Sequence, residues 1–305
     1  MYRNTFLSVM FLACCFNGSL CAQSDAQIYE RTCDAKTYPF SDPSPVATPN
    51  NSYYPYFRFD GFSMQAQEKQ WKMVVLENDY VKLTVTPEIG GKIWGAIDKV
   101  NNKEFVYTNG VVKFRDVAMR GPWTSGGIEF NFGIIGHAPT CSTPIDYLTK
   151  KNVDGSVSCH IFSYEWITRT VWNVEINLPK DKAYFTTHTT WFNQSSIDQP
   201  YYQWMNAGYA TKTGTRFYYP GTYSIGHSGD LHPYPIDEEG RDVSWYDNNN
   251  FGASKSLHII GDYNDYFGIY WHNEKHGSAH YSNYDEKLGM KFYLWSFSRE
   301  GAIWE

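Results

Sequence analysis

Apolar and polar residues alternate with a period of two in several short runs, and this pattern constrains the fold most strongly. Val81, Leu83 and Val85 alternate with lysine and threonine, and apolar residues over 172–178 alternate with asparagine and glutamate. A period of two is typical of a strand with one buried face. We see no amphipathic helical period in the sequence. Further strand-like runs cover 156–166, 183–192, 201–210, 255–260, 266–272 and 288–297.

The composition supports an all-β chain. Of its 305 residues, 11 are Trp, 25 Tyr and 19 Phe, and aromatic side chains favour strands over helix bundles. Gly, Pro and Asn turns at short intervals predict an antiparallel sandwich or barrel. The formal net charge of −6, without a basic run, argues against nucleic acid or anionic lipid as a partner.

The first residues have the features of a secretory signal. Arg3 is followed by an apolar stretch over 6–16 and by small residues up to Ala22, which predicts a signal peptide over 1–22. The stretch is too short to span a bilayer, and no later segment is long enough. We therefore expect a secreted or periplasmic protein without a membrane span. A lipid anchor on Cys14, Cys15 or Cys21 is the less favoured alternative, because none has a typical lipoprotein lead-in.

The rest of the chain is predicted to contain one domain. Residues 23–69 are rich in Pro, Ser, Asn and Asp, which predicts an irregular leader, and the strand pattern occupies 70–305. Removal of the signal leaves Cys33, Cys141 and Cys159. Cys141 and Cys159 either form a disulfide or act as two small buried hydrophobic residues, and we propose no nucleophilic role for them.

Three segments combine aromatic rings with polar groups. The first covers 120–132 and continues to His137, Asp146 and Tyr147, the second covers 201–206, and the third covers 241–248. Because sugars present apolar C–H faces and hydroxyl groups, such segments favour a carbohydrate site. The alternative for each aromatic residue is core packing. The residues expected to bind substrate are Arg120, Trp123, Asn131, Asp146, Tyr147, Trp204, Asn206, Trp245 and Tyr246.

Four motifs, three of which contain some of these residues, carry a family resemblance. In order along the chain they are GGKIW over 90–94, GPWTSGGIEFN over 121–131, PIDY over 144–147 and DVSWY over 242–246. This order resembles the bacterial Domain of Unknown Function 5107 family over roughly 70–305. The resemblance implies an antiparallel, galactose-mutarotase-like β-supersandwich whose concave face binds carbohydrate. That superfamily includes sugar epimerases, glycoside hydrolase domains and polysaccharide lyase domains, so the fold alone does not select a reaction.

Two departures from the family pattern stand out. The pattern continues past Glu305, which predicts a domain incomplete at its C-terminus. Relatives often carry two adjacent histidines after the EFN block, whereas this chain has a single His137.

The candidate catalytic residues are Glu129, His137 and Asp242. Glycoside hydrolysis needs two opposed carboxyl groups, whereas mutarotation needs an acid and a base, commonly His and Glu. The structural alternatives are a salt bridge of Glu129 with Arg120, a histidine in a surface loop and an aspartate that forms a turn. Glu305 is a weaker candidate for a partner carboxylate, because a chain terminus holds a group poorly.

The sequence predicts neither a metal nor a cofactor. His272, His276 and His280 are spaced by four, but a glycine and polar residues between them indicate a hairpin rather than a helix, so the three rings would not converge. We expect a secreted carbohydrate-binding or carbohydrate-active domain that acts on a glycan by general acid–base chemistry, as a glycoside hydrolase or an aldose-epimerase-like enzyme. The alternative is a non-catalytic sugar-binding or scaffold domain of a polysaccharide-utilisation system.

Overall fold

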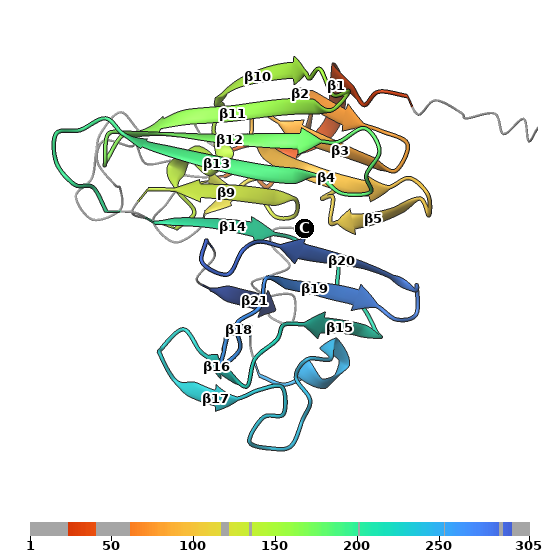
Figure 1. Cartoon of the computed structure of the whole chain (residues 1–305), viewed down its shortest axis with the longest axis vertical. Helices are drawn as coiled ribbons and strands as arrows, with labels where there is room; N and C mark the ends of the chain where they lie inside the picture. Colours follow the sequence, from red (N-terminus) through yellow and green to blue (C-terminus); the bar gives the residue numbers. More distant parts are fainter. Residues whose placement is uncertain are drawn as a thin grey trace, which may run out of the picture.

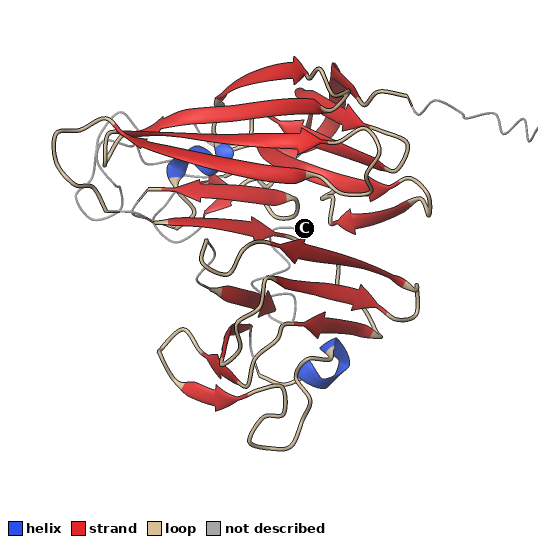
Figure 2. Cartoon of the chain, viewed as in Figure 1, coloured by secondary structure: helices blue, strands red, loops and turns tan. Residues whose placement is uncertain are grey.

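The structure is a computed structural model and describes residues 24–40, 62–116, 122–133, 136–200, 202–252, 254–286 and 289–294. Within these ranges the chain is nearly all β, with short 3-10 helices as its only helical segments (Figure 2). Strands pair antiparallel apart from a short parallel contact between the first and sixth strands. The prediction of an antiparallel all-β sandwich is confirmed.

The largest sheet has eight strands in the order β14-β9-β4-β3-β2-β1-β6, with β5 paired to β4. It lies in the upper part of Figure 1. Its strands are β1 (Gln27–Tyr38), β2 (Gln67–Glu77), β3 (Val81–Thr86), β4 (Lys92–Asp98), β5 (Lys103–Val106), β6 (Val112–Lys113), β9 (Ile128–Phe132) and β14 (Gln203–Ala207).

A four-stranded sheet covers one face of this large sheet and encloses the main core with it. In β12, Trp172, Val174, Ile176 and Leu178 are all buried, as the period of two predicts. The ring of Trp172 stacks on that of Phe132 from the large sheet at 4.5 Å, so aromatic packing joins the two layers. The strands of this sheet are β10 (Asp146–Lys151), β11 (Val157–Glu165), β12 (Thr170–Leu178) and β13 (Thr186–Asn193).

The other face of the large sheet carries a smaller apolar cluster that includes Trp71, Trp94 and Phe114. Two short elements contact each other near this face, and the second of them also contacts β9. They are the strand β8 (Pro122–Trp123), which pairs with β7 (Arg115–Asp116), and the 3-10 helix η1 (Pro139–Ser142). Strand β8 brings Trp123 to the face on which Glu129 lies.

The last third of the chain forms two further sheets around a second core, in the lower part of Figure 1. One sheet has the order β15-β19-β20 and the other the order β17-β16-β18-β21. The elements are β15 (Thr215–Tyr218), β16 (Tyr223–Ile225), β17 (Leu231–Pro233), η2 (Tyr246–Asn249), β18 (Lys255–Ile260), β19 (Tyr266–Trp271), β20 (His276–Tyr281) and β21 (Met290–Leu294).

The expected irregular leader over 23–69 is corrected in part. Residues Gln27–Tyr38 form β1, which pairs along its length with β2. The prolines that suggested an irregular segment begin at Pro39, immediately after the strand, and the strand itself contains the Ile, Thr and Tyr residues that pleated surfaces favour. Its faces are mostly exposed, so it lacks the buried-face signal of the core strands.

Both chain ends lie partly outside the described residues. The predicted signal over 1–22, the Cys14, Cys15 and Cys21 alternatives and the C-terminal Glu305 all fall there. Among the described residues, none belongs to a helix with the length and apolarity that crossing a membrane requires.

Candidate functional site

Strand β9 directs an acidic and an amide side chain to one face of the large sheet. Ile128, Phe130 and Phe132 enter the main core, so the alternating Glu129 and Asn131 point to the opposite face. Both polar residues are buried, with Glu129 2% exposed and Asn131 fully covered. A carboxylate in such a place needs hydrogen bonds and neighbouring positive charge to remain ionised.

The carboxylate of Glu129 has three side-chain partners. Asn131 Nδ2 donates to Oε1 at 2.6 Å, and His137 Nδ1 lies 2.8 Å from the same oxygen. The indole N–H of Trp123 donates to Oε2. Because an ionised carboxylate can only accept, Nδ1 of His137 carries the proton of this contact, and Nε2 is the ring nitrogen left for other chemistry.

A buried lysine adds positive charge near this carboxylate. Ile93 pairs with Ile128 of β9, so the neighbouring Lys92 lies on the same face as Glu129. Its Nζ donates to the carbonyl of Thr124 at 2.5 Å and to the hydroxyl of Thr124 at 3.2 Å. Sequence reasoning overlooked this residue. The available signal was a lysine within the otherwise apolar run that follows the Gly90-Gly91 turn.

The two charges shift each other's pKa. Burial alone would raise the pKa of Glu129, but the charge and hydrogen bond of His137, together with Lys92, lower it to about 2. Burial lowers the pKa of Lys92 to about 8, although the carboxylate of Glu129 acts in the opposite direction. Glu129 is therefore a permanent anion at neutral pH.

The loop after β9 folds His137 back over Glu129. The backbone of His137 has a φ of 53°, in the left-handed region that few non-glycine residues adopt. Asn131 Oδ1 accepts the backbone N–H of Ala138 at 3.0 Å and so holds this loop to the strand. The His137 ring lies edge-on to Trp123 at 5.4 Å and to Trp204 at 4.8 Å. Its side chain remains 21% exposed, whereas the Glu129 side chain beneath it is almost fully covered.

Strand β14 completes this group of residues. Trp204 pairs with Asn131 and Asn206 pairs with Glu129 across the antiparallel ladder, so both side chains share the face of Glu129. Nε1 of Trp204 is buried without a hydrogen-bond partner among the described residues. The first two predicted segments therefore meet, and we call Trp123, Glu129, Asn131, His137, Trp204 and Asn206 the β9 site.

The two glycines before β9 have a structural function. Gly126 and Gly127 both adopt left-handed backbone, with φ of 73° and 67°. A Cβ on Gly127 would lie 2.2 Å from the carbonyl oxygen of Ile93. A pair of glycines can allow either the close approach of a ligand or a sharp turn, and here the structure shows a turn packed closely against β4.

Asp146 and Tyr147 do not join the β9 site. They begin β10 in the four-stranded sheet, where Asp146 is exposed. The hydroxyl of Tyr147 donates to Glu30 Oε1 at 2.8 Å, and Lys72 Nζ lies 5.8 Å from the centre of its ring. The side-chain contacts of Tyr147 are thus with β1 and β2. Arg120, the other predicted ligand of this segment, lies outside the described residues.

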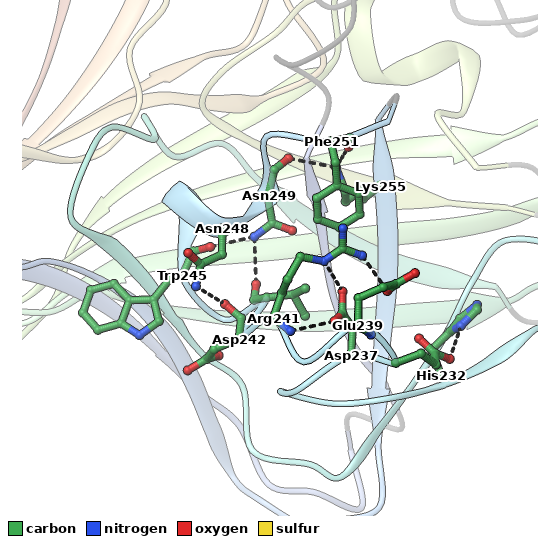
Figure 3. Close-up of polar contacts among 12 residues, drawn as sticks. His232, Asp237, Glu239, Arg241, Asp242, Trp245, Asn248, Asn249, Phe251 and Lys255 are labelled. Carbon is green, nitrogen blue, oxygen red and sulfur yellow. Dashed lines mark hydrogen bonds and ion pairs between the residues drawn. The ribbon is translucent and has the colours of Figure 1, made fainter.

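The third predicted segment belongs to the second core. Asp242 Oδ1 accepts from the backbone N–H of Ser244 at 3.1 Å and from its hydroxyl at 2.5 Å, which is the turn-forming alternative. The backbone carbonyl of Asp242 also accepts from Nδ2 of Asn248 at 2.9 Å (Figure 3). Trp245 lies next to Arg216 of β15, and Tyr246 packs against the second core. None of these contacts is with a residue of β9. They therefore do not include the expected approach of Asp242 to Glu129.

The three histidines spaced by four have separate surroundings. His272 contacts the hydroxyl of Tyr218, His276 stacks on Trp271, and His280 packs beside Phe267. Within the described ranges, no group of three or more His, Cys, Asp or Glu side chains has a geometry that could hold a metal ion.

The structure also distinguishes between the two alternatives for Cys141 and Cys159, a disulfide or two buried thiols. Cys141 and Cys159 are free thiols and are both buried. Burial raises the pKa of the Cys141 thiol and raises that of Cys159 to about 12. The structure therefore shows two small buried hydrophobic residues in place of a disulfide.

The β9 site has the parts of a histidine-based proton-transfer centre. A carboxylate that accepts from Nδ1 fixes the tautomer and the orientation of the ring, so that Nε2 can accept or return a proton. Trp123 and Trp204 flank the ring, and Asn206 supplies an amide on the same face. Among the described residues no second carboxylate hydrogen-bonds to this group.

Comparison with known proteins places the chain in a family. Its residues 48–305 match the family model described as Domain of unknown function (DUF5107). The crystal structure of a TPR-domain containing protein from Parabacteroides distasonis ATCC 8503 superposes with a TM-score of 0.78 at 23% identity. That match covers 90% of this chain but 47% of the other, so this chain spans about half the length of that protein, and the likeness shows the fold alone. The Slr1438 protein from Synechocystis sp. PCC 6803 has a TM-score of 0.47 at 12% identity, over 65% of this chain and 72% of the other. From the match of its residues 48–305 to the family model, we conclude that this chain belongs to the DUF5107 family.

Proposed function

We propose that this chain is a secreted carbohydrate-active domain in which His137 transfers protons to and from a sugar at the β9 site. The observation that carries the proposal is the 2.8 Å contact between Nδ1 of His137 and Oε1 of Glu129. It makes His137 the acid–base group, and it makes the buried Glu129 a positioning residue. The galactose-mutarotase-like assignment belongs to the same proposal, and the antiparallel sandwich supports it.

The proposed reaction class is proton transfer at the anomeric centre, as in mutarotation or epimerisation of an aldose. Nε2 of His137 would accept the proton of the anomeric hydroxyl group and return a proton to the ring oxygen as the ring opens. Trp123 and Trp204 would contact the apolar face of the pyranose, and Asn206 would bond to a hydroxyl group. Hydrolysis by two opposed carboxyl groups is less favoured, because among the described residues Glu129 is the one carboxylate in the contacts of the β9 site.

The test is the rate of anomer interconversion for a panel of reducing sugars, followed by polarimetry or NMR, with a glycan panel screened for products. We expect H137A to lose at least a hundredfold in rate and E129Q to lose roughly tenfold to a hundredfold, since positioned acid–base groups contribute about 10²–10⁴. His160 provides a matched control, because its Nε2 lies 3.7 Å from Glu175 on another sheet. H160Q should leave the rate unchanged. Equal rates for wild type and H137A would refute the proposal.

Sugar binding without turnover is the second candidate, and the burial of Glu129 favours it. A binding domain would bind a sugar with an affinity that W204A lowers. It would convert no sugar or glycan of the panel into a product. Because both candidates use the same aromatic residues, product formation is the measurement that separates them.

A further inference from the structure

A second group of aromatic side chains lies on the outer face of the β15–β19–β20 sheet. The inner face of this sheet, with Phe217, Ile269 and Trp271, packs into the second core. Residues at alternate positions therefore point outward. The outward aromatic and cationic residues are Arg216, Tyr218, Tyr266, Tyr270 and Tyr281, and with Trp245 we call them the aromatic face.

The strand register aligns these residues in rows. Arg216 pairs with Tyr270 of β19 and also bridges to Trp245, so Trp245, Arg216 and Tyr270 form one cross-strand row. Tyr266 pairs directly with Tyr281 and forms another row. Tyr218, Tyr266 and Tyr281 are 44%, 58% and 69% exposed, so their rings are available to a ligand.

Small residues separate the tyrosines. Gly268 pairs with Ala279, so this pair carries no side chain larger than a methyl group, whereas the ring of Tyr270 lies against its partner Gly277. The rings of the tyrosines therefore border a low floor at Gly268 and Ala279. A floor of this kind, with rings at its edges, allows a sugar ring to lie flat while its C–H groups contact tyrosine faces.

Arg216 is the one charged side chain among the outward strand positions of this sheet. Its guanidinium lies 5.1 Å from the ring centre of Tyr218 and 5.1 Å from that of Trp245. The hydroxyl of Tyr218 contacts Nε2 of His272 at 3.1 Å, and this contact holds the Tyr218 ring beside the guanidinium of Arg216. Nε of Arg216 is buried without a hydrogen-bond partner among the described residues, and none of the ion pairs within the described ranges involves this guanidinium.

A guanidinium held between two rings and lacking a carboxylate partner fits an anionic group of a ligand, because a planar fork of N–H donors matches a carboxylate. We infer that the aromatic face binds an anionic glycan chain, with a uronate carboxylate at Arg216 and sugar rings on Tyr218, Tyr266 and Tyr281. This surface goes beyond the proposed function, since it shares no residue with the β9 site.

The experiment is a calorimetric titration of the full chain with fragments of polygalacturonate and with the same fragments after reduction of their carboxyl groups. We expect wild type to bind the acidic form and to bind the reduced form at least tenfold more weakly. R216Q should lose at least tenfold in affinity for the acidic form, and Y281A about threefold to tenfold. K275Q removes one positive charge from the exposed hairpin turn between β19 and β20, and should bind as wild type does.

Four results would overturn the inference: no binding by wild type, equal affinity for the two forms, an unchanged affinity in R216Q, or equal binding of polyglutamate, which would indicate charge alone. Thermal unfolding establishes whether each variant is folded. If R216Q does not fold, Y281A still tests the inference, because the side chain of Tyr281 is largely exposed and its removal should not disturb the fold. The titration measures no turnover, so a failure of the acid–base proposal for His137 leaves its outcome unaffected.

Discussion

Oε1 of Glu129 lies 2.8 Å from Nδ1 of His137, and the carboxylate is buried beneath a ring that still reaches solvent. The two residues are eight positions apart in the sequence, and the histidine contacts the strand that carries the carboxylate. This relationship makes the histidine the accessible member of the pair. It also makes the ionisation of Glu129 part of the stability of the fold.

Stability at low pH should depend on Glu129. Its folded-state pKa is lowered from 4.5 to about 2, so its contribution is fully present above pH 4.5 and is lost as the pH falls toward 2. The contribution is on the order of 3 kcal/mol. Urea unfolding of wild type and E129Q between pH 2 and pH 7 measures it, and E129Q should have the flatter pH dependence. E175Q, which alters a more exposed carboxylate, should retain the dependence of wild type.

At high pH we expect a second rise of stability with pH, which comes from Lys92. Its folded-state pKa is lowered from 10.5 to about 8, so the folded state releases this proton first. The unfolded state then binds more protons between pH 8 and 10.5, and stability should rise there, by on the order of 3 kcal/mol. K92M should lack this rise, whereas K275M, at an exposed turn, should keep it. A rise of equal size in K92M would show that another group is responsible.

Substitution of Gly127 should be strongly destabilising. In G127A the new Cβ would lie 2.2 Å from a backbone oxygen of β4, in addition to the cost of left-handed backbone. We expect a loss of about 2–4 kcal/mol in the free energy of unfolding. Gly240 is the matched control, because its φ is 81° but a Cβ there would meet nothing within 4 Å. G240A should cost only about 1 kcal/mol, and similar losses for the two variants would contradict this explanation.

The stack of Trp172 on Phe132 should be a major part of the main core. W172A removes a fully buried indole that joins the two sheets, and we expect a loss of about 3–5 kcal/mol. Trp166, in the turn after β11, is 57% exposed, so W166A should cost less than about 1 kcal/mol. Chemical denaturation of both variants measures the difference. A loss in W172A no larger than that in W166A would mean that the sheets are joined by other contacts.

Local pattern was sufficient for much of the fold. The period of two over 172–178 correctly identified β12 and its buried face, because side chains of a strand alternate whatever the strand pairs with. The same rule puts Glu129 and Asn131 on one face of β9. The exposed β1 could not be recognised in this way, because its pairing with β2, rather than a buried face, makes it a strand.

Long-range pairing decided which candidates meet. Asn206 lies opposite Glu129 only because β14 pairs with β9 in one register, and a shift of one residue would turn it to the other face. Local patterns predicted the core strands, their buried faces and the kinds of side chain available for a site, but they missed β1. Contacts between distant parts of the chain bring His137 and Trp204 to Glu129 and place Trp245 beside Arg216 near a second core. Side-chain alternation is a property of each strand, whereas sheet order and register depend on contacts between residues far apart in the chain.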